Sequence, residues 1–247
     1  MTKSCTDLEG RSRGQYYCST EMKQSPEIVR FAKEIRSQLN LLPSSTTAAV
    51  RATRREFSRR IASAAPESVI QLALHLLNEN SDLLRFFSYE LITHHKLASK
   101  QLTIDDLLKL GRGLNSWSSV DCFAMYLSGP MWAQGRLSDK TVATWARSKD
   151  RWWRRTALVS TVALSRRGNP DDLLKGAKIC SLLTTDKDDM VVKALSWALR
   201  EVAKKHPKEA RAFLAEHNHT LAARVIREVN NKLRTGLKTP RTSATKA

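Results

Sequence analysis

Residues 191–205 read VVKALSWALREVAKK, and their apolar side chains recur at intervals of three and four positions. The resulting stripe consists of Val191, Ala194, Leu195, Ala198 and Val202. An α-helix turns once in about 3.6 residues, so this spacing places the stripe on one face of a helix. A helix with one apolar face has to bury that face against a neighbour. The stretch therefore predicts an amphipathic helix packed within an array of other helices.

The same period returns along the chain, and helix-start signals recur at nearly regular intervals. Further stripes begin at Ile28, Val69 and Ala222, and no run alternates convincingly as a β-strand does. Signals in which a cap or a proline precedes an acidic first turn occur at Ser25–Glu27, Ala65–Glu67, Thr103–Asp106, Ser138–Asp139, Asn169–Asp171 and His206–Glu209. Their spacing of about 32 to 40 residues, with two helices per interval, is typical of HEAT-like repeats. We therefore predict an all-α superhelix, an α-solenoid with one concave face.

The chain is strongly basic. Its 247 residues include 42 lysines and arginines against 24 aspartates and glutamates, which gives a net charge of +18 and a pI near 10.2. Such a charge repels itself in a compact fold, and a polyanionic partner relieves the repulsion. Nucleic acid is the first candidate partner and an anionic membrane surface is the second. The alternative is a charge that serves solubility, which usually has a magnitude of about 2–8 in a small domain. We expect a basic concave face that binds duplex DNA.

The sequence favours a cytoplasmic, monomeric protein with one repeat domain. It shows neither the apolar segment of a signal peptide nor an apolar run of the roughly eighteen residues that a membrane span needs. Cys5, Cys18, Cys122 and Cys180 are far apart, so we expect reduced thiols, no metal site and no cofactor. We expect residues 1–24 to be loosely ordered, 25–235 to form the repeat domain, and 236–247 to be a disordered basic tail.

Three predicted helices carry residues that core packing does not require. In the helix 191–205, Trp197 lies about 120° from the apolar stripe, at roughly 100° per residue. Lys193, Arg200 and Lys204 share that face. Cations bind phosphates and an aromatic ring contacts a base or a sugar, so this face is a candidate DNA-binding surface. The alternative is that Trp197 packs against the next repeat, and the periodicity does not decide between the two.

A second helix begins near residue 150 and brings Arg151, Arg154 and Arg155 to one face. The planar guanidinium group donates to two phosphate oxygens at once, so these arginines are candidate DNA-binding residues. The alternative is a solvated arginine face. Trp152 and Trp153 lie in the same cluster, and we expect at least one of them in the core.

A third helix carries Trp117 and Asp121, which are four positions apart and therefore neighbours on one helical face. A carboxylate that faces DNA weakens binding, because DNA is itself an anion, so its presence in a basic chain calls for another role. The alternative is an ordinary aspartate that bonds backbone N–H groups at a helix start.

These segments resemble the DNA alkylation repair proteins, the AlkD-like DNA glycosylases built of HEAT-like repeats. The resemblance covers roughly residues 25–235 and rests on Ser116-Trp117 with Val120-Asp121, on Trp152-Trp153-Arg154-Arg155-Thr156-Ala157, and on Lys193-Ala194-Leu195-Ser196-Trp197-Ala198-Leu199-Arg200-Glu201. It implies a superhelix that holds DNA on its concave face. It also implies the release of N3- or N7-alkylated purines by cleavage of the N-glycosidic bond, as the first step of base excision repair.

The resemblance further implies roles for individual residues. Trp117 and Trp197 match the tryptophans that flank the lesion nucleotide, Asp121 matches the catalytic aspartate, and Arg155 matches an arginine near the lesion backbone. A carboxylate stabilises the cationic sugar as the purine leaves, and the reaction requires no cofactor. Many glycosylases flip the base into a pocket, whereas the resemblance implies that the base stays stacked.

The sequence departs from the pattern of the family in two places, and it leaves one alternative function open. Many relatives have an acid directly after the first tryptophan, where this chain has Ser118, and a tyrosine in the first repeat, which residues 41–51 lack. The range of alkyl adducts is therefore not determined. The alternative function is a non-catalytic HEAT-like module that binds DNA, RNA or a protein. Because Trp117, Asp121 and Trp197 are all present, we favour the enzyme.

Overall fold

The computed structural model describes residues 25–79, 81–167 and 169–240, and the regular elements in these ranges are all helical. They are α1 (Pro26–Asn40), α2 (Thr47–Arg60), α3 (Pro66–Leu76), α4 (Asp82–Thr93), α5 (Ala98–Gln101), α6 (Ile104–Leu110), α7 (Trp117–Phe123), a π-helical turn (Ala124–Ser128), α8 (Gly129–Ala133), α9 (Asp139–Ala146), α10 (Arg151–Arg167), α11 (Pro170–Ser181), α12 (Asp189–Lys205), α13 (Pro207–Glu216) and α14 (Ala223–Thr235). The predicted all-α fold is confirmed. The predicted loose segment 1–24 and residues 241–247 of the predicted tail lie outside the described ranges.

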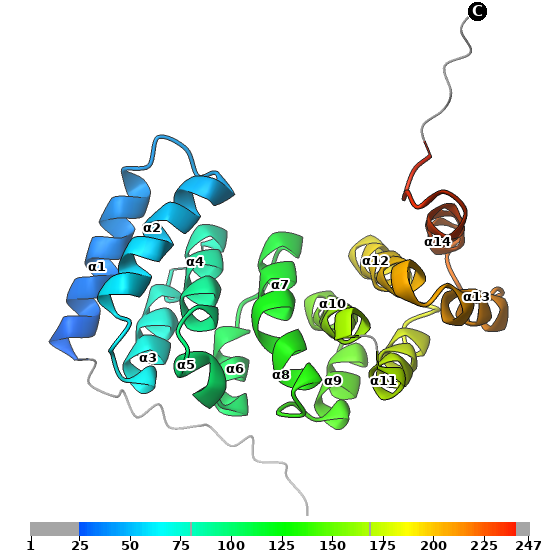
Figure 1. Ribbon diagram of the computed structural model, residues 1–247, viewed down its shortest axis with the longest axis horizontal. Helices are drawn as coiled ribbons and strands as arrows, with labels where there is room; N and C mark the ends of the chain where they lie inside the picture. Colours follow the sequence, from blue (N-terminus) through cyan, green and yellow to red (C-terminus); the bar gives the residue numbers. More distant parts are fainter. Residues whose placement is uncertain (1–24, 80, 168, 241–247) are drawn as a thin grey trace, which may run out of the picture.

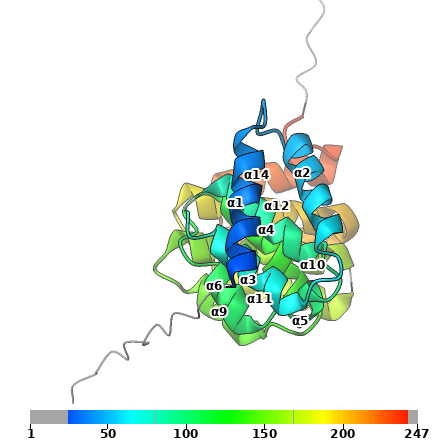
Figure 2. The same cartoon turned by 90° about the vertical axis from the view of Figure 1, so that its left-hand side faces the viewer.

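The helices stack side by side into a curved array with two layers (Figure 1). The inner side of the arc is formed by α2, α4, α7, α10, α12 and α14, and each of these helices contacts the next. The outer side contains α1, α3, α6, α9, α11 and α13. Viewed from the end at which α1 and α2 lie in front, the rest of the array extends behind them (Figure 2). The chain is thus a superhelix of helical repeats.

The predicted helix-start signals each begin the first helix of a consecutive pair. Side chains that accept a hydrogen bond from a first-turn N–H cap α1, α6, α9 and α11, and they are Ser25, Thr103, Ser138 and Asn169. Prolines take the first positions of α3 and α13. These residues suit a helix start, because first-turn N–H groups have no partner within the helix and proline has no N–H to satisfy.

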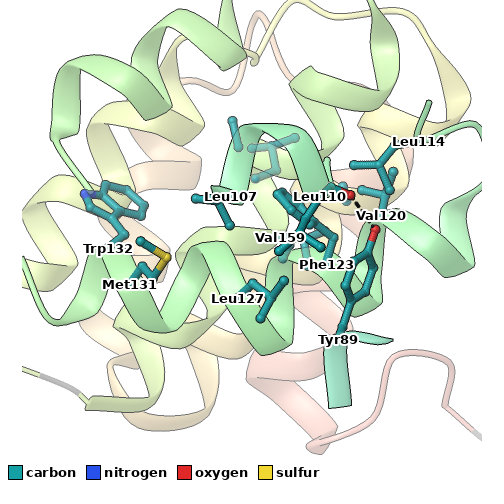
Figure 3. Close-up of a cluster of buried hydrophobic side chains, with 14 of the residues drawn as sticks. Tyr89, Leu107, Leu110, Leu114, Val120, Phe123, Leu127, Met131, Trp132 and Val159 are labelled. Atoms are coloured by element: carbon teal, nitrogen blue, oxygen red, sulfur yellow. Dashed lines mark hydrogen bonds between the residues drawn. The ribbon is translucent and has the colours of Figure 1, made fainter. Parts of the chain in front are cut away.

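The core lies between the two layers. Around α7 it contains Val120 and Phe123, together with Tyr89 of α4 and Val159 of α10 (Figure 3). The buried Tyr89 hydroxyl donates to the carbonyl of Leu110 at 2.9 Å, which satisfies its polar end. In α12 the predicted stripe is confirmed, with Val202 partly buried and its other members buried.

A π-helical turn and a glycine fix the position of α7 relative to α10. The helix continues from α7 through the turn into α8, where a Cβ on Gly129 would lie 2.7 Å from the Ala124 carbonyl oxygen and 2.9 Å from Cβ of Ala163. Glycine therefore permits a close approach to α10 that a side chain would block. The hydroxyls of Ser128 and Ser160 join the two helices at 2.7 Å.

Within the described ranges, the structure contains no helix with both the length and the apolar character needed to cross a bilayer. Cys122 and Cys180 are free thiols. Burial raises the pKa of each thiol to about 12, so both stay protonated at neutral pH. Cys5 and Cys18 lie outside the described residues.

Candidate active site

Six of the nine predicted site residues line one hollow of about 330 Å³, and Arg151, Arg154 and Lys204 are not among its lining residues. Its walls come from α7, α10, α12 and the segment after α14, and the lining residues are Trp117, Asp121, Arg155, Met190, Lys193, Trp197, Arg200 and Lys238. The structure thus brings together the two tryptophans and the aspartate that the sequence singled out.

Local structure explains why Trp117 and Asp121 face this hollow. Ser116 caps α7 by accepting the Ser119 N–H at 3.1 Å, while Val120 and Phe123 occupy the core face of the helix. Trp117 and Asp121 lie on the other face, and Trp117 is 58% exposed. Asp121 is not the helix cap, because Ser116 fills that role.

The start of α7 is also tied to α4. One carboxylate oxygen of Asp82 accepts hydrogen bonds from the hydroxyls of Ser116 and Ser118, each at 2.6 Å. These two serines stand on either side of Trp117. The contact therefore fixes the backbone that carries the exposed indole.

Asp121 forms a two-pronged ion pair with Arg155. Nε and Nη2 of Arg155 donate to Oδ1 and Oδ2 of Asp121, both at 2.9 Å, and Nη1 donates to the Met190 carbonyl at 2.6 Å. The Arg155 side chain is only 7% exposed. Its guanidinium group is therefore bound by other groups of the protein, namely the Asp121 carboxylate and the Met190 carbonyl.

Burial raises the pKa of the Asp121 carboxyl above its usual range, and the hydrogen bonds and charge of Arg155 act in the opposite direction. The arginine therefore opposes the rise in the pKa of this carboxyl. Asp121 is therefore a partly desolvated carboxylate with a fixed orientation, an arrangement that often marks a functional group.

Trp197 combines the two roles that the periodicity left open. It is partly buried and packs against the core, yet it lines the hollow. Its indole Nε1 donates to Oε1 of Glu201 at 3.3 Å, one turn further along α12. Trp152 and Trp153 are both partly buried against the core, and the Trp153 ring meets the rings of Phe123 and Trp145 edge-on or tilted.

Each of the six cations predicted to bind DNA has an acidic partner. The pairs are Arg151–Asp188, Arg154–Asp186, Arg155–Asp121, Lys193–Asp189, Arg200–Glu228 and Lys204–Glu201. Arg151, Lys193 and Lys204 are about half exposed and lie within reach of an incoming ligand. Arg154, Arg155 and Arg200 are largely enclosed; Arg155 and Arg200 join neighbouring helices, and Arg154 joins α10 to the segment between α11 and α12.

Lys238 is a site residue that the sequence did not indicate. Periodicity assigns residues to faces of helices, and Lys238 lies two residues beyond Gly236, which ends α14. Its only sequence signal is membership of the basic segment that begins at residue 236.

An α-helical repeat array with two tryptophans and an aspartate in one hollow is the arrangement that the resemblance implied, and the structure adds the ion pair between that aspartate and Arg155. The chain belongs to the DNA alkylation repair enzyme family, whose model matches residues 22–233. A search among curated proteins found no match.

A solved structure described as a predicted DNA alkylation repair enzyme from Enterococcus faecalis is similar to this chain. The TM-score is 0.65 at 16% sequence identity, and the similarity covers 86% of this chain and 97% of that one. At this identity the likeness shows the shared fold alone.

Proposed function

We propose that this protein is a DNA glycosylase that releases N3- or N7-alkylated purines from duplex DNA by hydrolysing the N-glycosidic bond. The observation that carries the proposal is the Asp121 carboxylate, held by Arg155 in a hollow that also contains Trp117 and Trp197. Membership of the DNA alkylation repair enzyme family supports a DNA substrate with alkylation damage.

The chemistry of the damaged base suits this site. Alkylation at N3 or N7 puts a positive charge on the purine and makes it a good leaving group. As the glycosidic bond breaks, the deoxyribose gains oxocarbenium character, and a nearby carboxylate stabilises that charge. Water adds to C1′ and loses one proton to solvent, and the products are the free, neutral alkylated base and an abasic site.

Arg155 orients the Asp121 carboxylate but leaves some of its acceptor positions free. An ionised carboxylate offers about four acceptor positions, and Arg155 occupies one on each oxygen. The remaining positions are available to the sugar or to the attacking water. Arg155 is therefore a positioning residue in this proposal, and Asp121 is the catalytic residue.

The tryptophans supply aromatic faces for a cationic base, an attraction worth about 0.5–2 kcal/mol per ring.

The half-exposed cations Arg151, Lys193 and Lys204 stand on α10 and α12 of the inner layer and would contact backbone phosphates there. We propose that the inner side of the arc is a basic concave surface for duplex DNA and that one monomer acts on one lesion.

Replacing Trp117 with alanine is expected to slow base release by about 2- to 30-fold, which is the rate equivalent of about 0.5–2 kcal/mol of lost cation–π attraction. Phenylalanine at this position should recover part of the rate. Because Trp117 is more than half exposed, the melting temperature should change little. The measurement is single-turnover release of N7-methylguanine from a duplex, alongside a thermal melt.

Leu174→Ala is the matched control for that variant. Leu174 is also an exposed apolar residue, at 56%, but it lies on α11 in the outer layer. It should leave base release unchanged. Release by the Trp117→Ala variant at the wild-type rate would remove this ring from the proposed mechanism.

A further inference from the structure

The hollow receives one residue from the segment that follows the last helix. Gly236 ends α14 in the left-handed conformation, with φ 74°, which a side chain would disfavour. Beyond it, the Asn231 side chain donates to the Lys238 carbonyl at 3.2 Å and holds the segment against α14. As a result, Lys238 lines the same hollow as Trp117 and Asp121.

The Lys238 ammonium group is anchored by a carboxylate that also serves a second cation. Its Nζ lies 3.6 Å from Oε1 of Glu228. The other oxygen of this buried carboxylate accepts from the Ser196 hydroxyl at 2.6 Å and lies 3.7 Å from Nε of Arg200. Two positive charges therefore share one negative charge at the edge of the hollow, and the cluster keeps an excess positive charge.

Of the two cations, Lys238 is the one with access to a ligand. Its side chain is 52% exposed, whereas that of Arg200 is largely enclosed. An ammonium group has three donors, so the contact with Glu228 leaves donors for an incoming anion. In a DNA strand that crosses the hollow, the available anions are backbone phosphates.

We infer that Lys238 binds a phosphate of the lesion-bearing strand immediately beside the damaged nucleotide, on a segment that Glu228 holds in place. The inference rests on the proposed function and extends it, because it makes the segment after α14 a wall of the DNA site. A phosphate contact positions the strand and carries no information about the base.

Replacing Lys238 with glutamine is expected to weaken binding to damaged and undamaged duplexes alike. The slope of log affinity against log salt concentration should become shallower by about 0.9, the value for one lost phosphate contact on duplex DNA. Lys238→Arg keeps the charge and should restore the wild-type slope. Fluorescence anisotropy with labelled duplexes, one carrying a stable tetrahydrofuran abasic analogue, provides the measurement. Lys140→Gln, an exposed position on α9 in the outer layer, removes the same charge elsewhere and should leave the slope unchanged.

A scan with neutral methylphosphonate linkages locates the contact. Each phosphate on either side of the abasic analogue is neutralised in turn, and both proteins are titrated. At the linkage that Lys238 binds, wild type should lose affinity and Lys238→Gln should lose no more, because the two changes remove the same interaction. Equal losses by both proteins at each linkage beside the lesion would overturn the inference, as would an unchanged salt slope.

These binding readouts separate this inference from the proposed function. Suppose that the wild-type protein releases base, while Lys238→Gln has the same salt slope and the same losses in the methylphosphonate scan as wild type. The inference about Lys238 is then wrong, and the proposed glycosylase activity is supported. If the scan places the Lys238 contact at a phosphate beside the lesion but the wild-type protein releases no base, the inference about Lys238 is supported and the proposed glycosylase activity is wrong. In either case the melting temperature of Lys238→Gln should stay close to that of wild type, because a half-exposed ion pair contributes at most about 1 kcal/mol to the free energy of unfolding.

Discussion

Replacing Asp121 with asparagine is expected to slow the release of alkylated base by a factor on the order of 10²–10³, the usual cost of losing one preorganised electrostatic group. Asparagine has nearly the same shape but no negative charge to stabilise the sugar cation. Binding to undamaged DNA should hold or tighten, because a repulsive charge near the phosphates is removed. Single-turnover base release and a DNA titration, run on the same preparations, test both statements.

The ion pair with Arg155 makes a matched control necessary. The amide of the Asp121→Asn variant would accept from Arg155 without a charge, so the variant is expected to melt at a lower temperature as well. Asp186 accepts from Arg154 at 2.6 Å in a comparably enclosed pair that does not line the hollow. Asp186→Asn should therefore lower the melting temperature without slowing release. Equal slowing in both variants, or full release by Asp121→Asn, would show that the Asp121 carboxylate has no catalytic role.

Replacing Arg155 with methionine is expected to lower the free energy of unfolding by about 3 kcal/mol, near the lower end of the range for leaving one partner of a buried pair without the other. The lower end applies because Asp121 keeps some solvent exposure. Arg151→Met, on the same helix, removes a half-exposed pair with Asp188 and should cost about 1 kcal/mol or less. Denaturant titration of the two variants compares them directly, and equal small losses would contradict a structural role for Arg155.

For the Arg155→Met variant, the pH dependence of base release and of stability has a definite sign. Burial already raises the pKa of Asp121, and loss of Arg155 removes the influence that opposes this rise. The ionised carboxylate is the active form, so base release should be lost as pH falls, and it should be lost at higher pH in Arg155→Met than in wild type. The stability deficit of the variant should be largest above the folded-state pKa of Asp121. It should shrink as pH falls and disappear below the folded-state pKa of Asp121 in wild type, where the carboxyl is neutral in both proteins.

The features that sequence could predict are local ones. A cap such as Thr103 with Asp106, or the four-residue spacing of Trp117 and Asp121, depends on one turn of helix and needs no knowledge of neighbours. The same reasoning gave the face on which Trp197 lies but not how deeply its ring is buried, because that depends on the helices packed beside it.

The features that sequence missed are contacts between repeats. Arg154 and Asp186 are 32 positions apart, and Arg155 and Asp121 are 34 positions apart, so each pair joins side chains that lie about one repeat interval from each other. A spacing of opposite charges that matches the repeat interval is the signal that would have indicated these pairs. Lys238 has no such signal, because its place follows from the turn at Gly236.

The most direct test of the central claim is incubation of the wild-type protein with a duplex that carries one N7-methylguanine, followed by chromatography of the released bases. The expected result is free N7-methylguanine in the same amount as new abasic sites, with release abolished or strongly slowed in Asp121→Asn. Tight binding to the duplex without release of N7-methylguanine, or of any other N3- or N7-alkylated purine, would contradict the claim and leave a non-catalytic DNA-binding repeat protein.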